Sequence, residues 1–149
     1  KLSVNNMEII CKNEKQTAKF AKKFASSLKG GEIILLIGDL GAGKTTFTKS
    51  LAKALKIKEH ITSPTFTIVN EYHSGKLGLY HFDMYRIEDI SEVVELGLNE
   101  YFNSNYVCVI EWPERIGNLI PKKHIKIEIE KLDETERKFL VSFIGYEEK

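Results

Sequence analysis

Hydrophobic residues recur along the first third of the chain in spacings that distinguish helices from strands. A short apolar run at 7–11 predicts an edge strand. In residues 20–28 the apolar positions recur every three or four residues, which predicts an amphipathic helix capped by Asn13 and ended by Gly30-Gly31. Residues 33–37 are five consecutive aliphatic residues, which is typical of a strand buried on both faces of a parallel sheet. The chain is therefore expected to begin strand-helix-strand.

Two further helices and several strands are expected after this start. The helices are predicted over 45–55 and 89–98. Strands are predicted, in chain order, at 68–72, 77–85, 107–110, 125–129 and 139–143. The first two should pair around Ser74-Gly75, and the last two alternate apolar with polar residues, as half-buried antiparallel strands do. This order of elements predicts an α/β fold with a mostly parallel centre and antiparallel strand additions.

Length and composition narrow the class of protein. The chain has 149 residues, the size of one domain, so residues 1–149 are expected to fold as a single unit. The formal net charge of +1 excludes a strongly basic nucleic-acid-binding domain and leaves open only a local basic patch. Cys11 and Cys108 are far apart and lack a metal-binding spacing. Without a long apolar run or a signal-peptide pattern, we expect no membrane contact and a cytoplasmic location.

The segment between the strand at 33–37 and the helix at 45–55 carries the clearest chemistry. Residues 38–45 read GDLGAGKT and fit the P-loop pattern GxxxxGK[ST]. The glycines let backbone N–H groups turn towards phosphates, and Lys44 reaches the β- and γ-phosphates as a point charge. Thr45 offers a hydroxyl to magnesium, and the helix that starts here directs its positive end at the same phosphates. The sequence thus predicts a site for a nucleoside triphosphate with magnesium.

Two acidic residues are candidates for the rest of this site. P-loop proteins usually supply a second magnesium ligand from an acid at the end of a neighbouring strand. Glu111 directly follows the apolar run 107–110, and Asp83 ends the segment 79–83. Because parallel strands open their carboxyl ends on one crevice, both acids can reach the phosphates. Glu111 is the better magnesium position, whereas Asp83 suits the positioning of an attacking water, although an isolated acid at a strand end more often faces solvent.

Two other features allow a functional and a structural interpretation. The segment 63–67, SPTFT, stands where switch GTPases carry a threonine that senses the γ-phosphate, here Thr65. Ser-Pro also favours an ordinary turn, and position alone favours the turn. Trp112, the only tryptophan, directly follows Glu111 and either covers the site or packs in the core.

Four separated segments together resemble the TsaE (YjeE) family in order and spacing. They are GDLGAGKTTF at 38–47, SPTFT at 63–67, YHFDMYR at 80–86 and EWPE at 111–114. The resemblance covers about residues 17–114, since the final strands are too generic to add to it. It implies a P-loop NTPase-like fold, with a central, mostly parallel sheet flanked by helices, and it implies ATP and Mg2+ as cofactors.

The resemblance also implies a role in synthesis of threonylcarbamoyladenosine, the modified adenosine next to the anticodon of tRNA. Members of the family bind and hydrolyse ATP and support a transferase made of TsaD and TsaB, which they activate or reset. They do not transfer the carbamoyl group themselves, so contact with tRNA is expected only through that complex. We expect low intrinsic turnover that the partner stimulates, because no arginine finger is evident and Arg86 is the nearest source.

Carried over by position, the resemblance assigns roles to single residues. The phosphates would be bound by Gly38, Asp39, Leu40, Gly41, Ala42, Gly43, Lys44, Thr45 and Thr46. Thr45 and Glu111 would bind magnesium. Lys44, Asp83 and Thr65 would be catalytic, with Thr65 as the switch residue. Thr17 matches a threonine near the expected position of the adenine. Met84 and Phe66 replace a leucine and a tyrosine common in the family, and neither change removes a group that the mechanism needs.

Three other functions compete with this interpretation. A small-molecule P-loop kinase would use the same loop, but such kinases usually clamp their substrates with several arginines, and this chain has only three. A GTPase would need an Asn/Thr-Lys-x-Asp motif, whose nearest string, EKLD at 130–133, lacks the first residue. An RNA-binding module would use lysines such as those in 49–58 or 122–126, but lysine runs are more often solvated surface.

Overall fold

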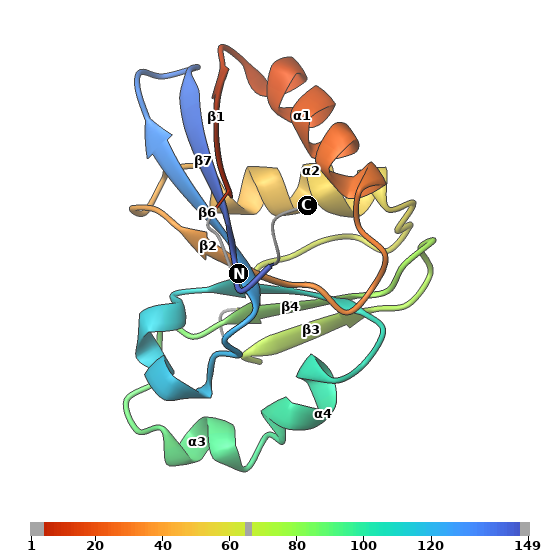
Figure 1. The fold of residues 1–149 in the computed structure, drawn as a ribbon, viewed down its shortest axis with the longest axis vertical. Helices are drawn as coiled ribbons and strands as arrows, with labels where there is room; N and C mark the ends of the chain where they lie inside the picture. The colour runs from red at the N-terminus through yellow and green to blue at the C-terminus, as the bar shows by residue number, and fades with distance from the viewer. Residues whose placement is uncertain (1–4, 65–66, 147–149) are drawn as a thin grey trace.

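One seven-stranded sheet with helices on both faces organises the chain (Figure 1). The computed structural model describes residues 5–64 and 67–146, so Thr65 and Phe66 of the predicted switch segment lie outside the described residues. The strands are β1 (Asn5–Cys11), β2 (Ile33–Ile37), β3 (Val69–Tyr72), β4 (Leu79–Asp83), β5 (Val107–Glu111), β6 (His124–Lys131) and β7 (Arg137–Ile144). The helices are α1 (Glu14–Ser26), α2 (Lys44–Ala54), α3 (Ser91–Val94) and α4 (Leu98–Phe102), with short 3-10 turns η1 (Pro113–Arg115) and η2 (Gly117–Leu119).

The strand order is β1-β7-β6-β2-β5-β4-β3. The four central strands, β6, β2, β5 and β4, are mutually parallel, and β7, β1 and β3 add to them in antiparallel pairs. This confirms the α/β class with a mostly parallel centre. The antiparallel pairing expected of the last two strands is confirmed for β6 and β7, whereas the parallel pairing of β6 with β2 was not foreseen. Alternation of apolar and polar residues indicates which face of a strand is buried, but it does not encode the direction of the neighbouring strand.

The central strand β2 divides the core into two layers. Ile34 and Leu36 face a cluster that contains the apolar side chains of α1 and α2, whereas Ile33 and Leu35 face a second cluster around α3 and α4. Figure 1 shows α1 and α2 on one side of the twisted sheet and α3 and α4 on the other. Since successive side chains of a strand point to opposite faces, a strand covered on both sides must be aliphatic throughout.

The predicted first helix begins as its sequence suggested, but it ends at Ser26, before the glycine pair at 30–31 that was expected to stop it. Asn13 precedes α1 in an extended conformation, and its side chain accepts a hydrogen bond from the Gln16 backbone N–H at 2.9 Å. The Gln16 side chain in return accepts from the Lys12 N–H at 2.7 Å, so two backbone donors at the helix start are satisfied. This pair of bonds fixes where α1 leaves β1 and therefore where Thr17, one turn into the helix, lies.

The helix predicted over 89–98 is broken into two short helices. α3 ends at Val94, and α4 begins at Leu98 after Gly97, which adopts a left-handed conformation with φ of 78°. That conformation suits glycine, which has no Cβ, and it interrupts a right-handed helix. The apolar spacing reflects burial of Val93 and Leu98 against the sheet rather than one continuous helix.

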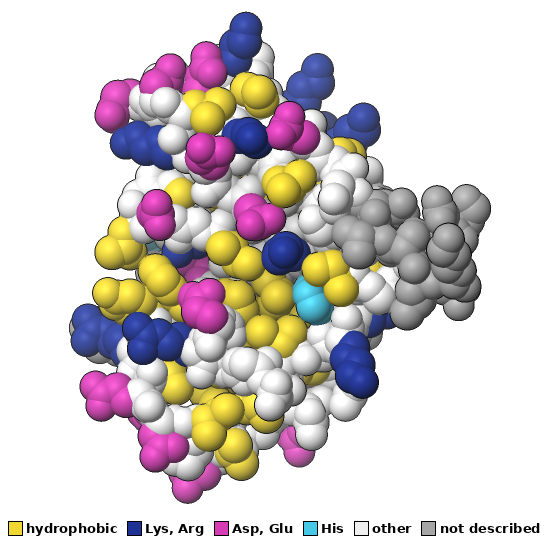
Figure 2. Space-filling view, turned by 60° about the vertical axis from the view of Figure 1, so that its left-hand side comes forward, with side chains coloured by type: hydrophobic (Ala, Val, Ile, Leu, Met, Phe, Trp, Pro, Cys, Tyr) yellow, Lys and Arg dark blue, Asp and Glu magenta, His cyan; other side chains and the backbone are white. Residues whose placement is uncertain are grey.

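The surface carries charges of both signs. The face shown in Figure 2 has lysine, arginine, aspartate and glutamate side chains interspersed, with hydrophobic side chains between them. A mixed face of this kind does not form the single-sign field expected of a nucleic-acid-binding surface. Within the part of the chain that the structure describes, no helix is long and apolar enough to cross a membrane.

Candidate nucleotide site

The glycine-rich loop lies between the carboxyl end of β2 and the start of α2. Gly38 has no room for a side chain, because a Cβ there would lie 2.8 Å from the Ile129 carbonyl oxygen. Gly43 precedes α2 with φ of 109°, a backbone conformation that disfavours side chains. The tip of the loop, Asp39, Leu40 and Gly41, is exposed, whereas Ala42 is buried. Because α2 begins at Lys44, directly after the loop, the backbone amides of its first turn lie next to the loop, and helix N-termini attract anions.

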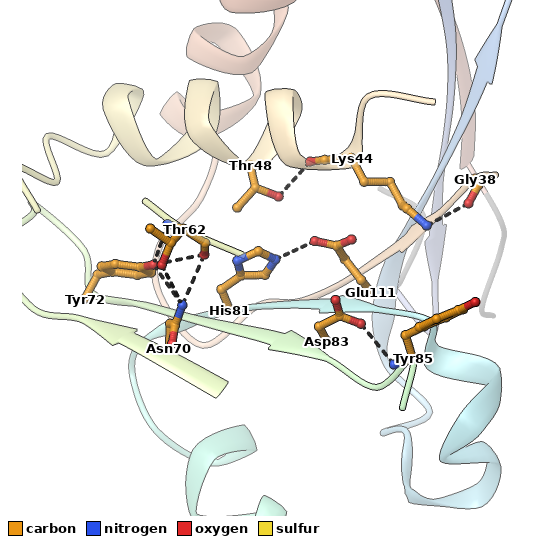
Figure 3. Close-up of polar contacts among 10 residues, drawn as sticks. All are labelled: Gly38, Lys44, Thr48, Thr62, Asn70, Tyr72, His81, Asp83, Tyr85 and Glu111. Atoms are coloured by element: carbon orange, nitrogen blue, oxygen red, sulfur yellow. Dashed lines mark hydrogen bonds and ion pairs between the residues drawn. The ribbon is translucent and has the colours of Figure 1, made fainter. Parts of the chain in front are cut away.

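Lys44 is the first residue of α2 and is only 6% exposed. Its Nζ donates a hydrogen bond of 2.7 Å to the Gly38 carbonyl oxygen, across the mouth of the loop (Figure 3). The same Nζ lies 4.1 Å from the centroid of the Trp112 ring, within the range of a cation–π contact. The lysine charge is thus held over the loop by one carbonyl and one aromatic face.

The two candidate acids lie side by side at the ends of neighbouring strands. In the register of the sheet Asp83 is opposite Glu111, and Glu111 is opposite Leu36, two residues before the loop. Register partners on adjacent strands point to the same face, which here is the face covered by α2. The tertiary structure therefore brings together Lys44, Asp83 and Glu111, as Figure 3 shows.

Asp83 lies in an environment that favours its neutral form. Burial raises the pKa of the Asp83 carboxyl above its ordinary value, and the nearby Glu111 charge raises it further. A hydrogen bond of 2.9 Å from the Tyr85 backbone N–H, together with the charges of His81 and Lys44, opposes this shift. A carboxyl whose pKa moves towards neutrality is better suited to accept a proton during a reaction.

The residues fit a magnesium ion that is shared with phosphates better than one held by the protein alone. Among the described residues, no group of three or more His, Cys, Asp or Glu is placed to hold a metal ion. Magnesium, however, commonly takes only one or two protein oxygens and completes its shell with phosphates and water. Glu111 supplies a buried carboxylate, and Thr45, half-buried in the first turn of α2, supplies a hydroxyl. These two residues are the ones that could hold the ion.

A cavity of about 180 Å³ lies beside the P-loop. Its walls are formed by Asn13, Glu14, Thr17, Gly43, Thr46, Glu134, Thr135, Arg137 and Phe139. Thr17 is 5% exposed and its Oγ1 donates to the Asn13 carbonyl oxygen at 3.4 Å. The structure therefore places Thr17 beside Gly43 and Thr46 of the loop region, although the two segments are far apart in sequence.

Arg137 was missed by the sequence analysis as a site residue. It comes from the start of β7, and its Nε donates a hydrogen bond of 2.8 Å to the Ala42 carbonyl oxygen of the loop. Its Nη1 donates to three carbonyl oxygens of the preceding hairpin, those of Asp133, Glu134 and Glu136, at 2.9, 3.4 and 3.1 Å. One guanidinium therefore ties the hairpin to the P-loop, and no local sequence pattern marked it.

His81 was also overlooked, although it stood within one of the matching segments. Its Nε2 lies 2.6 Å from Glu111 Oε2, and both residues are buried. The signal was available, because His81 and Asp83 are two residues apart on β4 and must point to the same face. A polar residue two positions before a candidate acid on the same strand is therefore expected to point to the same site as the acid.

Trp112 lies over Lys44 and also packs against the core cluster around α3 and α4. It is half-buried, its ring lies over Lys44, and it contacts the Tyr85 ring at a centroid distance of 4.9 Å. Its backbone has φ of 57°, a left-handed conformation that costs a non-glycine residue about 1–3 kcal/mol. Arg115 lines the same crevice as Lys44 and Trp112. The strained residue therefore lies beside the phosphate loop, where such outliers are commonly functional.

These features define the class of P-loop NTPase-type proteins. The glycine-rich loop follows the buried parallel strand β2, Lys44 is the first residue of the next helix, and Glu111 ends the adjacent strand β5. Comparison with known proteins identifies the group within that class. The family model for "Threonylcarbamoyl adenosine biosynthesis protein TsaE" matches residues 11–139. The chain belongs to the TsaE family.

Individual relatives agree with this assignment. The chain is 45% identical over 133 residues to a Bacillus subtilis protein named tRNA threonylcarbamoyladenosine biosynthesis protein TsaE, covering 89% of this chain and 83% of the relative. Proteins of the same name from Aquifex aeolicus and Treponema pallidum are 45% and 38% identical, over 88% and 91% of this chain and 92% and 100% of their own lengths. A crystal structure of Bacillus subtilis YdiB superposes with a TM-score of 0.83 at 38% identity, over 96% of this chain and 88% of that one.

Proposed function

We propose that this chain is a magnesium-dependent P-loop ATPase that takes part in the synthesis of threonylcarbamoyladenosine in tRNA. The observation that carries the proposal is the convergence of Lys44, Asp83 and Glu111 beside the glycine-rich loop, at the carboxyl ends of β2, β4 and β5. Membership of the TsaE family supports the pathway, because the relatives carry that function in their names.

The geometry suggests how the residues would divide the work. The backbone of the loop from Gly38 to Thr46 would bind the phosphates, and Lys44 would exchange its bond to the Gly38 carbonyl for phosphate oxygens. Thr45 and Glu111 would hold magnesium, which neutralises charge on the phosphates when bound. Asp83, with its raised pKa, would orient the attacking water and accept its proton. Thr65 remains the proposed switch residue on the strength of the family resemblance.

The adenine end of ATP is proposed to occupy the cavity beside α1. Thr17 and Thr46 line that cavity, and the Arg137 guanidinium forms another part of its wall. The phosphates would then run along the loop from this cavity to the crevice of Lys44 and Trp112. The γ-phosphate would lie at the end of this path, next to Asp83 and Glu111. This arrangement assigns the base and the reacting phosphate to two distinct hollows beside the loop.

The proposed partners are TsaD and TsaB, with tRNA contacted only through them, and the chain would work in the cytoplasm. Low intrinsic turnover is part of the proposal. Among the described residues, Arg115 is the one arginine that lines the crevice of Lys44, and its guanidinium lies 5.8 Å from the centroid of the Tyr85 ring. A partner that moves Arg115 or supplies its own cation would accelerate hydrolysis. The mixed charge of the surface in Figure 2 favours contact with protein over direct contact with RNA.

Lys44→Ala tests nucleotide binding, with Lys49→Ala as the matched control. Both lysines belong to α2, but Lys44 is buried at the loop and Lys49 is exposed. Isothermal calorimetry with ATP and Mg2+ should show binding weakened at least about tenfold in Lys44→Ala, equivalent to about 1.4 kcal/mol, and unchanged in Lys49→Ala. Equal affinity of the two variants would refute the proposed phosphate site.

Phosphate release measured with and without TsaD and TsaB tests the activity. The expected result is slow release by the chain alone and faster release with the partners. Equal rates would contradict partner stimulation, and transfer of the γ-phosphate to a nucleoside or sugar instead of water would identify a kinase.

A further inference from the structure

His81 forms a buried contact with the carboxylate proposed to bind magnesium. Its ring comes from β4 and is fully buried, and Glu111 at the end of β5 is 4% exposed. The His81 Nε2 and Glu111 Oε2 atoms are 2.6 Å apart, as Figure 3 shows. Carboxylate oxygens accept hydrogen bonds, so in this contact the His81 Nε2–H donates a hydrogen bond to Glu111 Oε2. The bond links two adjacent strands directly beneath the P-loop helix.

The other nitrogen of the ring argues against a purely structural role. Nδ1 of His81 is buried and has no hydrogen-bond partner, and it is the one buried side-chain nitrogen or oxygen atom without a partner among the described residues. Leaving a buried polar atom unpaired is unfavourable, and a leucine of similar size would fill this position without that cost. The contact of Nε2 with Glu111 is therefore the interaction that explains a histidine at this position.

That contact limits how Glu111 can bind a metal. One carboxylate oxygen, Oε2, is occupied by His81, and among the described residues no donor bonds to the other oxygen, Oε1. A glutamate side chain rotates about three bonds, and fixing one oxygen also fixes the second. Partners of this kind orient metal-binding carboxylates, and their removal typically weakens metal affinity.

We propose that His81 is a positioning residue that holds Glu111 so that only Oε1 is presented to magnesium. His81 acts through Glu111 and touches neither nucleotide nor metal. This inference rests on the proposed magnesium-dependent nucleotide site. Single-oxygen binding leaves the remaining positions of the ion for phosphates and water, as magnesium prefers.

Three substitutions separate the two ring nitrogens. His81→Gln places an amide N–H about as far from the backbone as Nε2, so it can still donate to Glu111. His81→Asn is one methylene shorter and reaches only the position of Nδ1. His81→Leu removes both polar atoms and keeps the volume. The readout is nucleotide affinity by calorimetry in Mg2+ and again in EDTA, together with thermal unfolding of each variant without nucleotide.

The ratio of the two affinities measures how strongly magnesium promotes binding. This ratio should fall about 10–100-fold in His81→Leu and His81→Asn, with affinity in EDTA within about twofold of the wild type. In His81→Gln the ratio should stay near the wild-type value. In a Glu111→Gln background, where the ratio is already low, adding His81→Leu should lower it no further, because both residues act through one carboxylate.

The outcomes distinguish this inference from the function on which it rests. If the nucleotide affinity of the wild-type protein is the same in Mg2+ and in EDTA, both the proposed function and the positioning role of His81 are overturned. A normal wild-type ratio that His81→Leu leaves unchanged, or affinity lost equally in Mg2+ and EDTA, would overturn the positioning role alone. Should His81→Leu fail to fold, the comparison of His81→Gln with His81→Asn decides, since equal ratios in those two variants contradict the role of Nε2.

Discussion

Arg137 offers a direct test of how the hairpin between β6 and β7 supports the P-loop. Arg137→Met keeps most of the side-chain length but removes every hydrogen-bond donor. The change leaves the Ala42 carbonyl oxygen without the 2.8 Å bond from Nε, and it frees three carbonyl oxygens of the hairpin. The P-loop would then be fixed to the hairpin by packing alone.

The expected magnitude follows from the bond to Ala42. Hydrogen bonds to a charged group contribute about 1.5–3 kcal/mol, and the half-buried position of Arg137 allows water to replace part of that value. We therefore expect a loss of about 1.5 kcal/mol in the free energy of unfolding. If the same bond holds the loop in its binding conformation, nucleotide affinity should fall about tenfold, because 1.4 kcal/mol is a factor of ten.

Urea unfolding and calorimetry with ATP and Mg2+ measure the two quantities. Arg137→Lys keeps the charge but not the planar set of donors, so it should lose affinity almost as Arg137→Met does, if geometry rather than charge is responsible. Lys138→Met is the matched control on the next residue, whose ion pairs with Glu8 and Glu130 are partly exposed and contribute little. Destabilised Arg137→Met that still binds nucleotide within about twofold of the wild type would refute the reasoning.

Two further predictions concern the acid at the site and the core beneath the loop. Because burial raises the pKa of Asp83 in the folded state, the folded protein binds more protons than the unfolded one between the ordinary pKa and the raised pKa, and stability falls as pH rises through this window. Asp83→Asn should remove that loss, so its unfolding free energy relative to wild type, measured without nucleotide, should increase as pH rises above the ordinary aspartate pKa of about 4, while ATP hydrolysis is abolished. A difference independent of pH would contradict the burial of this carboxyl. Phe47 of α2 is fully buried and lies 5.5 Å, between ring centroids, from Phe139 and 5.8 Å from Phe20. Phe47→Ala should therefore lower the unfolding free energy in urea by about 3–5 kcal/mol, and Phe47→Leu by distinctly less, whereas equal small losses would mean that the aromatic cluster does not anchor the loop helix.

Local sequence was sufficient for most of the elements and for the central motif. The loop from Gly38 to Thr45 could be located because its residue types serve a backbone geometry set within a few positions, after a strand and before a helix. The same holds for α1, whose cap uses residues three apart, and for β2, whose aliphatic run required burial on both faces. Spacing failed at 89–98, where burial of apolar residues continued across a break at Gly97.

What the sequence by itself determined about this protein is therefore its class, its family and the order of its helices and strands. Only the tertiary structure decided that Asp83 lies opposite Glu111, that His81 bonds Glu111 across 30 residues, and that Arg137 supports Ala42 across 95. It also decided that β6 runs parallel to β2. The physical reason is that the phosphate loop is built from consecutive backbone units, whereas its supporting groups meet through strand register and packing between distant segments, which no short pattern encodes.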